Sequence, residues 1–143
     1  MTRILSFLAL VAVLAACASP PEYPPGSTRL PPCGSLPNCV NSDSGAGSQA
    51  IEPLAATESQ WRALKQWIAR QENWTIVEER EDFLQCVAVT PRMRYRDDVQ
   101  LLHQPELGLI HVRSSSRLGI SDMGANRERV ELLRDQLERI ADL

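Results

Sequence analysis

The order of helical and strand-like patterns in the second half of the chain constrains its fold more than any other feature. Trp61, Leu64 and Ile68 share one face of a predicted helix over residues 58–71, which begins at a capping box of Thr57 and Gln60. Strand patterns follow over residues 74–79, 83–90, 94–102 and 109–114. A second helix is predicted over 124–142 from a stripe of Val130, Leu133, Leu137 and Ile140.

This order predicts an α+β domain with two layers. A four-stranded, mostly antiparallel sheet is expected to pack against an N-terminal and a C-terminal helix. A four-residue loop over 104–107 would join the last two strands as a hairpin. That register sets Val99 opposite Val112 on the core face and Asp98 opposite Arg113 on the other face.

The first seventeen residues have the organisation of an export signal. Arg3 precedes a largely apolar run over residues 4–16, which is shorter than the ~20 residues that a membrane-spanning helix needs. Leu14-Ala15-Ala16-Cys17 resembles the bacterial lipobox, which implies cleavage before Cys17 and its acylation by chains such as palmitate. We therefore expect a lipoprotein signal peptide over 1–16 and a membrane anchor on Cys17. An ordinary secretory peptide with a chance cysteine is the alternative.

Residues 17–32 are expected to form a tether between this anchor and the folded part. The segment contains six prolines, and proline-rich chain favours extended polyproline II structure. A disordered N-terminus without a spacing role has the same composition. Residues 33–143 are then expected to form a single globular domain. The resemblance to lipoproteins further implies that Ala18 favours sorting to the outer membrane, with the domain facing the periplasm.

The remaining cysteines predict one disulfide bond. In an oxidising compartment Cys33 and Cys39, which flank turn-forming residues, are expected to pair. Zinc binding is the competing interpretation, but the spacing differs from that of zinc fingers. Cys86 lies in a strand pattern and is expected to be a reduced, buried thiol.

The densest cluster of polar residues lies in and after the last predicted strand and leads into the last predicted helix. Arginine forks, hydroxyl groups and a nearby helix N-terminus could together bind a phosphate or carboxylate; the candidate residues are Arg113, Ser114, Ser116, Arg117 and Asn126. In the structural alternative, Asp97 and Asp98 neutralise the two arginines, and Asp122 or Asn126 caps the helix. We assign Arg113 to Asp98 by the hairpin register, which leaves Arg117 as the residue available to a ligand. A further stripe of Arg92, Arg94 and Arg96 would make a basic strand edge that either meets anionic head groups or is merely solvated.

Other classes of function fit the chain less well. A hydrolase would need a serine among Ser114–Ser116 to meet a histidine base, yet no GxSxG elbow surrounds them and His111 alternates with Ser114 along one strand. The 5% aromatic content and the net charge of -3 argue against nucleic-acid binding. Two histidines beside four cysteines give no metal-binding pattern, and no cofactor is expected.

Four stretches resemble a bacterial family known as domain of unknown function 1499, which includes many small lipoproteins. They are CGSLPNCVNS at 33–42, IEPL at 51–54, RDDV at 96–99 and RSSSRLGISDMGANRERV at 113–130. Gln100 and Arg96 depart from the acidic and apolar residues that the family tends to have there. The resemblance implies no particular chemistry. We therefore expect a membrane-anchored envelope lipoprotein that acts as a binding or envelope-assembly module, with a small periplasmic hydrolase as the alternative. Its partner is expected to be an envelope component or a small anionic ligand.

Overall fold

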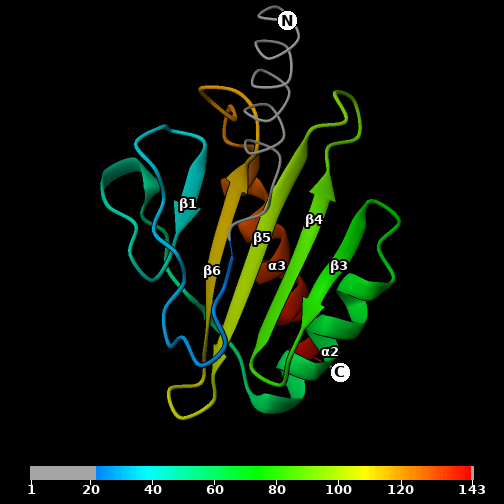
Figure 1. Ribbon diagram of the computed structural model, residues 1–143. Helices are drawn as coiled ribbons and strands as arrows, with labels where there is room; N and C mark the ends of the chain where they lie inside the picture. The colour runs from blue at the N-terminus through cyan, green and yellow to red at the C-terminus, as the bar shows by residue number, and fades with distance from the viewer. Residues whose placement is uncertain (1–21, 143) are drawn as a thin grey trace, which may run out of the picture.

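An antiparallel sheet with two helices on one face forms the centre of the molecule. The computed structural model describes residues 22–142 (Figure 1). The elements are β1 (Cys39–Asn41), the 3-10 helix η1 (Gly47–Gln49), β2 (Leu54–Ala55), α2 (Glu58–Ala69), β3 (Trp74–Glu79), β4 (Phe83–Val89), β5 (Arg96–Gln104), β6 (Leu109–Ser116) and α3 (Ala125–Ala141). The predicted α+β class is confirmed.

The sheet has six strands where the sequence predicts four. Its order is β1-β6-β5-β4-β3, and β2 pairs with β6 further along the same strand. The four predicted strands are β3 to β6. The two additional strands contain three and two residues, which is too short for an alternating pattern to be recognised.

The hairpin register differs from the prediction by two residues. The loop spans residues 105–108, and its last residue, Gly108, has φ 62°. Glycine adopts this left-handed conformation without the steric cost that other residues incur, so Gly108 belongs to the loop and not to the strand. Val99 therefore lies opposite Ser114, and Asp98 lies opposite Ser115 rather than Arg113.

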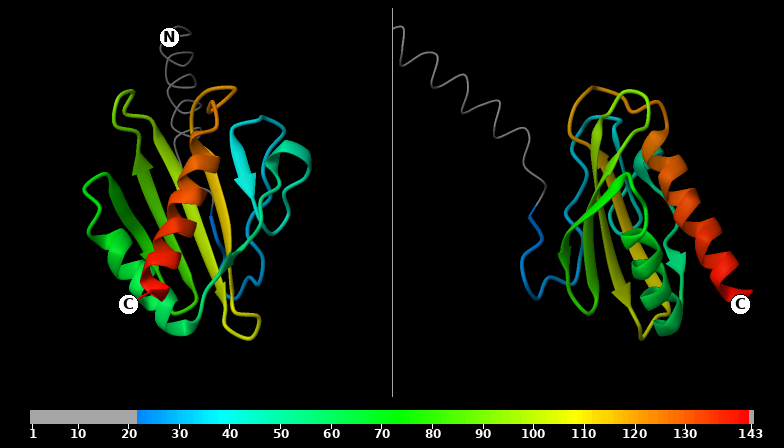
Figure 2. Two further views of the ribbon diagram at one scale, coloured as in Figure 1. Left: turned by 180° about the vertical axis from the view of Figure 1, so that it is seen from behind. Right: turned by 90° about the vertical axis from the view of Figure 1, so that its right-hand side faces the viewer.

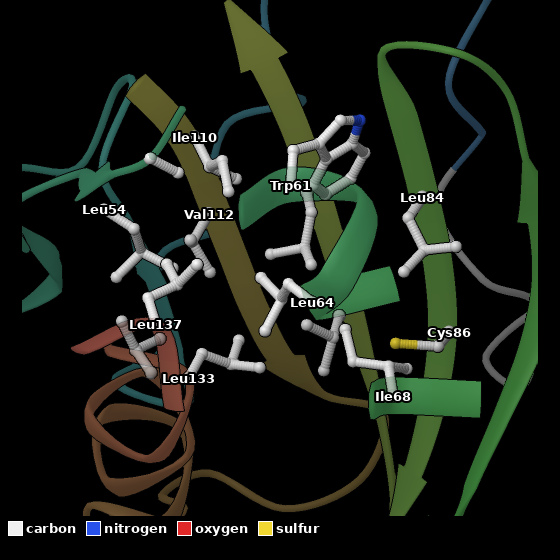
Figure 3. Packing of buried hydrophobic residues seen from close by; sticks show 14 of the residues in the cluster. Leu54, Trp61, Leu64, Ile68, Leu84, Cys86, Ile110, Val112, Leu133 and Leu137 are labelled. Carbon is white, nitrogen blue, oxygen red and sulfur yellow. The ribbon is translucent and has the colours of Figure 1, made fainter. Parts of the chain in front are cut away.

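Both helices pack on one face of the sheet as their apolar stripes predict (Figure 2). Thr57 and Gln60 form the predicted capping box at the start of α2. Trp61, Leu64 and Ile68 are fully buried, and Figure 3 shows them pointing toward the apolar side chains of α3 and the sheet. Within residues 22–142, no helix is both long and apolar enough to cross a bilayer.

The N-terminal part of the described chain covers the other face of the sheet. Figure 2 shows this segment on the side away from α3. Tyr23 and Leu30 are buried with Phe83 and Leu102 in a second, smaller core, and the Tyr23 and Phe83 rings stack with their centroids 4.0 Å apart. The interpretation of residues 17–32 as a tether is therefore wrong for residues 22–32, because two apolar side chains dock that segment on the sheet.

The predicted disulfide bond between Cys33 and Cys39 is present. It joins the end of the docked segment to β1. Cys86 is a free, buried thiol on β4, also as predicted. Cys17 and the signal-like residues lie outside the described residues.

Candidate functional site

A buried polar cluster connects the central strands to the first turns of α3. Arg129 Nη2 donates a hydrogen bond to Asp97 Oδ2 at 2.6 Å, and both side chains are almost fully buried. Arg129 Nη1 donates to Ser114 Oγ at 2.9 Å and to Asn126 Oδ1 at 2.7 Å. Ser114 in turn donates to Asn126 Oδ1 at 2.7 Å. The cluster therefore fixes α3 to β5 and β6 through one ion pair and its hydrogen bonds.

Asn126 is the residue on which this cluster and the preceding loop converge. Its Nδ2 lies within 3.0 Å of three acceptors, which are Asp122 Oδ2, Ser116 Oγ and the Asn38 carbonyl oxygen. Asp122 also accepts hydrogen bonds from the backbone N–H groups of Gly124 and Asn126. Burial alone would raise the pKa of Asp122, but these hydrogen bonds outweigh it and lower the pKa. Asp122 thus provides hydrogen-bond acceptors for backbone N–H groups at the N-terminus of α3.

A second acid–arginine pair lies on the opposite face of the sheet. Arg117 Nε and Nη2 donate to the two oxygens of Asp98 at 2.9 and 2.8 Å, and this hydrogen bonding raises the pKa of Arg117. Arg113 instead donates to Ser115 Oγ at 2.8 Å. Burial lowers the pKa of Arg113, and nearby Asp98 opposes that shift.

The prediction that Arg113 pairs with Asp98 and that Arg117 is left for a ligand is therefore wrong in both parts. Asp98 is bound by Arg117, the residue that we expected to be left for a ligand. The reason is the two-residue register shift, which places Arg113 opposite Gln100 instead of Asp98.

The structure does not assemble the predicted anion site. Alternate residues of a strand point to opposite faces, so Ser114 and Ser116 face α3 and contact Asn126. Arg113 and Arg117 point to the other face, where they bind Ser115 and Asp98. The sheet therefore separates the hydroxyl and amide groups from the two guanidinium groups.

The three serines have no histidine base among the described residues. His111 Nδ1 lies 3.3 Å from Ser42 Oγ, and Ser114 is hydrogen-bonded to Asn126 and Arg129. His103, at the far end of β5, stacks on Trp61. Hence no contact favours a serine hydrolase. Residues 22–142 also contain no group of three or more potential His, Cys, Asp or Glu metal ligands.

A small pocket opens beside Asp97, between the loop that precedes β5 and the loop that precedes α3. Its volume is about 230 Å³, and its lining consists of Thr90, Tyr95, Asp97, Ser116, Leu118, Gly119, Ser121, Asp122, Met123 and Ala125. Asp97 Oδ1 is buried and, among the described residues, has no hydrogen-bond partner. The pocket therefore combines apolar walls with a carboxylate residue, one of whose oxygens has no hydrogen-bond partner among the described residues.

Sequence reasoning missed Arg129 and most of the pocket. Arg129 follows Asn126 by three residues, so both side chains had to lie on one face of the predicted helix; this spacing was the available signal. Tyr95, Leu118 and Met123 come from loops, where no periodic pattern indicates the direction of a side chain.

The family comparison agrees with this domain. The model of the family described as "Protein of unknown function (DUF1499)" matches residues 29–137. The match begins before Cys33 and thus includes part of the segment docked on the sheet. No protein among the curated sequences matches the chain. Because the family model covers most of the chain, this protein belongs to the DUF1499 family of proteins of unknown function.

Proposed function

We propose that this protein is an envelope lipoprotein, anchored to the outer membrane through acylated Cys17 and facing the periplasm, whose domain is a binding module. The lipobox-like sequence before Cys17 supports the anchor. The Cys33–Cys39 disulfide supports export, because disulfide bonds persist mainly in oxidising compartments.

The pocket beside Asp97 is the part of the domain best suited to bind a ligand. The observation that supports this choice is that Asp97 Oδ1, a buried carboxylate oxygen, has no hydrogen-bond partner among the described residues. Leaving such an oxygen without a hydrogen bond is unfavourable, and a ligand that donates one relieves that cost. A larger surface depression of about 660 Å³ lies between α2 and α3, but none of its lining residues carries a buried, unpartnered polar atom.

The chemistry of this pocket favours a donor over an anion. Oδ1 of Asp97 can only accept hydrogen bonds, so it has no complementary group in a phosphate or carboxylate, whereas an ammonium or hydroxyl group can donate to it. Tyr95, Leu118 and Met123 supply apolar surface. We therefore propose a small amine-bearing or hydroxyl-bearing ligand with an apolar part, in place of the anionic ligand that the sequence predicted.

Three probes of equal chain length test this ligand class. Hexylamine, hexanol and hexanoate differ mainly in the charge and donor capacity of the head group. A ligand that binds only the folded state raises the melting temperature of the full chain by mass action. We expect hexylamine to raise it most and hexanoate to have no effect. Stabilisation by hexanoate equal to that by hexylamine would contradict the proposal.

Two matched substitutions on α3 locate the effect. Ala125→Leu adds volume at the pocket wall without removing a hydrogen bond from a side chain, and we expect it to abolish the response to hexylamine. Ala141→Leu makes the same change at an exposed position in the last turn and is expected to leave the response intact. A response that survives in Ala125→Leu would place the amine elsewhere.

The membrane anchor requires a separate test. Intact-mass analysis of the membrane fraction is expected to show a chain that begins at acylated Cys17. Cys17→Ser is expected to release the protein from the membrane, whereas Cys86→Ser, a change at a buried thiol, serves as the control and stays bound. An unmodified full-length chain in the cytoplasm would refute the anchor while leaving the pocket proposal open to its own test.

A further inference from the structure

Exposed apolar side chains gather at one end of the sheet. Residues 90–96, which end at the first residue of β5, and residues 117–124 lie at the same end of the sheet, as both views of the ribbon show (Figures 1 and 2). We call these two segments the tip. Nine large apolar side chains are exposed in the described chain, and five belong to the tip: Met93, Tyr95, Leu118, Ile120 and Met123. A concentration of exposed apolar side chains in two neighbouring loops is a feature of interaction sites.

The same loops carry unpaired positive charge. Arg92, Arg94 and Arg96 are exposed, and their side chains form no hydrogen bond or ion pair with any residue that the structure describes. The two loops contain one acidic residue, Asp122, and its oxygens accept hydrogen bonds from Gly124 and Asn126. The tip therefore presents apolar side chains beside three guanidinium groups with no free acid in the same loops.

The backbone of the tip adopts an unfavourable conformation at two residues. Arg94 and Met123 have φ values of 57° and 52°, and they are the two residues other than glycine with positive φ in the described chain. This conformation is unfavourable for residues with a side chain and is concentrated at functional sites. Met123 is nevertheless 96% exposed, so the fold accepts the cost while leaving this apolar side chain in solvent.

We propose that the tip docks on an anionic lipid surface. Apolar side chains that enter the boundary between head groups and acyl chains, with arginines that meet phosphate groups, give the two contributions on which interfacial binding depends. Basic and apolar residues alternate along 92–96, so both kinds of side chain would meet the same level of the bilayer. An arginine can keep its charge among the head groups while its aliphatic stem lies among apolar groups. Tyr95, Leu118 and Met123 also line the pocket beside Asp97, but the membrane contact requires neither a bound ligand nor acylation of Cys17.

Hydrogen exchange of the full chain tests this contact without altering the protein. The chain is compared in vesicles of phosphatidylethanolamine with phosphatidylglycerol, in vesicles of phosphatidylcholine alone, and in non-ionic detergent. We expect amide exchange at residues 92–96 and 117–124 of the tip to slow several-fold in the anionic vesicles only. The loop at residues 105–108 carries Leu107, which is 65% exposed, and is expected to exchange equally in all three.

Substitutions separate the apolar and charged contributions. Arg92→Gln is expected to weaken docking about fivefold, the effect of one basic residue near an anionic surface. Leu118→Ser is expected to reduce the protection of both loops, whereas Leu107→Ser, at a residue of nearly equal exposure, leaves it unchanged. Two outcomes overturn the proposal: equal protection in neutral and anionic vesicles, or protection in detergent that grows with protein concentration, which would assign the tip to a second copy of the chain.

Discussion

Arg129→Met tests whether the buried pair with Asp97 holds α3 to the sheet. The two groups are 2.6 Å apart, and their side chains are 9% and 2% exposed. With an effective dielectric constant of about 20, the attraction across that distance is roughly 6 kcal/mol. Desolvation of the two groups offsets part of it. Removing one partner of such a pair costs about 3–5 kcal/mol, and we expect Arg129→Met to lose that much stability.

The pair on the opposite face provides an internal comparison. Asp98 is as buried as Asp97, but Arg113 lies close enough to interact electrostatically with Asp98. Loss of Arg117 therefore leaves Asp98 near another positive charge, whereas Arg129 is the only cation that ion-pairs with Asp97 among the described residues. Arg117→Met is thus expected to cost less than Arg129→Met.

Urea unfolding of the full chain measures these differences. A lower midpoint at an unchanged slope reports a loss of stability. Arg129→Lys keeps the charge but not the forked contacts to Ser114 and Asn126, so its loss should be intermediate. In the double variant Asp97→Asn with Arg129→Met, no charge is left unpaired, and its loss should be smaller than the sum of the single losses. Strictly additive losses, or a cost below about 1 kcal/mol for Arg129→Met, would refute the reasoning.

Three further predictions concern other buried side chains. Burial raises the pKa of Cys86 to about 12, so iodoacetamide at pH 8 is expected to alkylate it only after unfolding; alkylation of the native protein would contradict its burial. Burial lowers the pKa of His103 below its usual value of about 6.5 despite the nearby Glu58. The unfolded state then binds more protons below pH 6.5, so the melting temperature should fall more steeply with acidification than in His103→Gln; an equal slope in the two proteins would contradict this prediction. Tyr23→Ala removes a ring that stacks on Phe83 and is expected to cost about 2–3 kcal/mol in urea unfolding, whereas an undocked segment would show no loss.

Periodicity predicted the elements whose burial extends over several turns or residues. The stripe of Trp61, Leu64 and Ile68 defined α2 because a helix of 12 residues buries the same face repeatedly. The register failed because it depends on one backbone conformation, that of Gly108, and not on a repeated pattern. A shift of two residues keeps every side chain on its predicted face, so the hydrophobic pattern alone could not detect the error.

The docked N-terminal segment was missed although a signal for it was present. β4 has the sequence FLQCVAV, and six of its seven residues are buried. A strand with apolar residues on both faces requires cover on both sides, yet the predicted helices cover one face. Phe83 and Leu102 therefore needed a partner, which Tyr23 and Leu30 provide. The many prolines around them resemble a linker by composition, and composition does not show which isolated apolar residue is buried.

Strand geometry explains why the polar residues of β5 and β6 stabilise the fold and why we assign ligand and membrane binding to the loops. Asp97 and Asp98 are adjacent, so they point to opposite faces of β5, and each binds an arginine on its own side. The serines of β6 are divided in the same way between Asn126 and Arg113. Substitutions in these pairs should therefore change stability first. The proposed ligand and membrane contacts therefore rest on groups that these pairs do not use: one oxygen of Asp97 and the side chains of the tip.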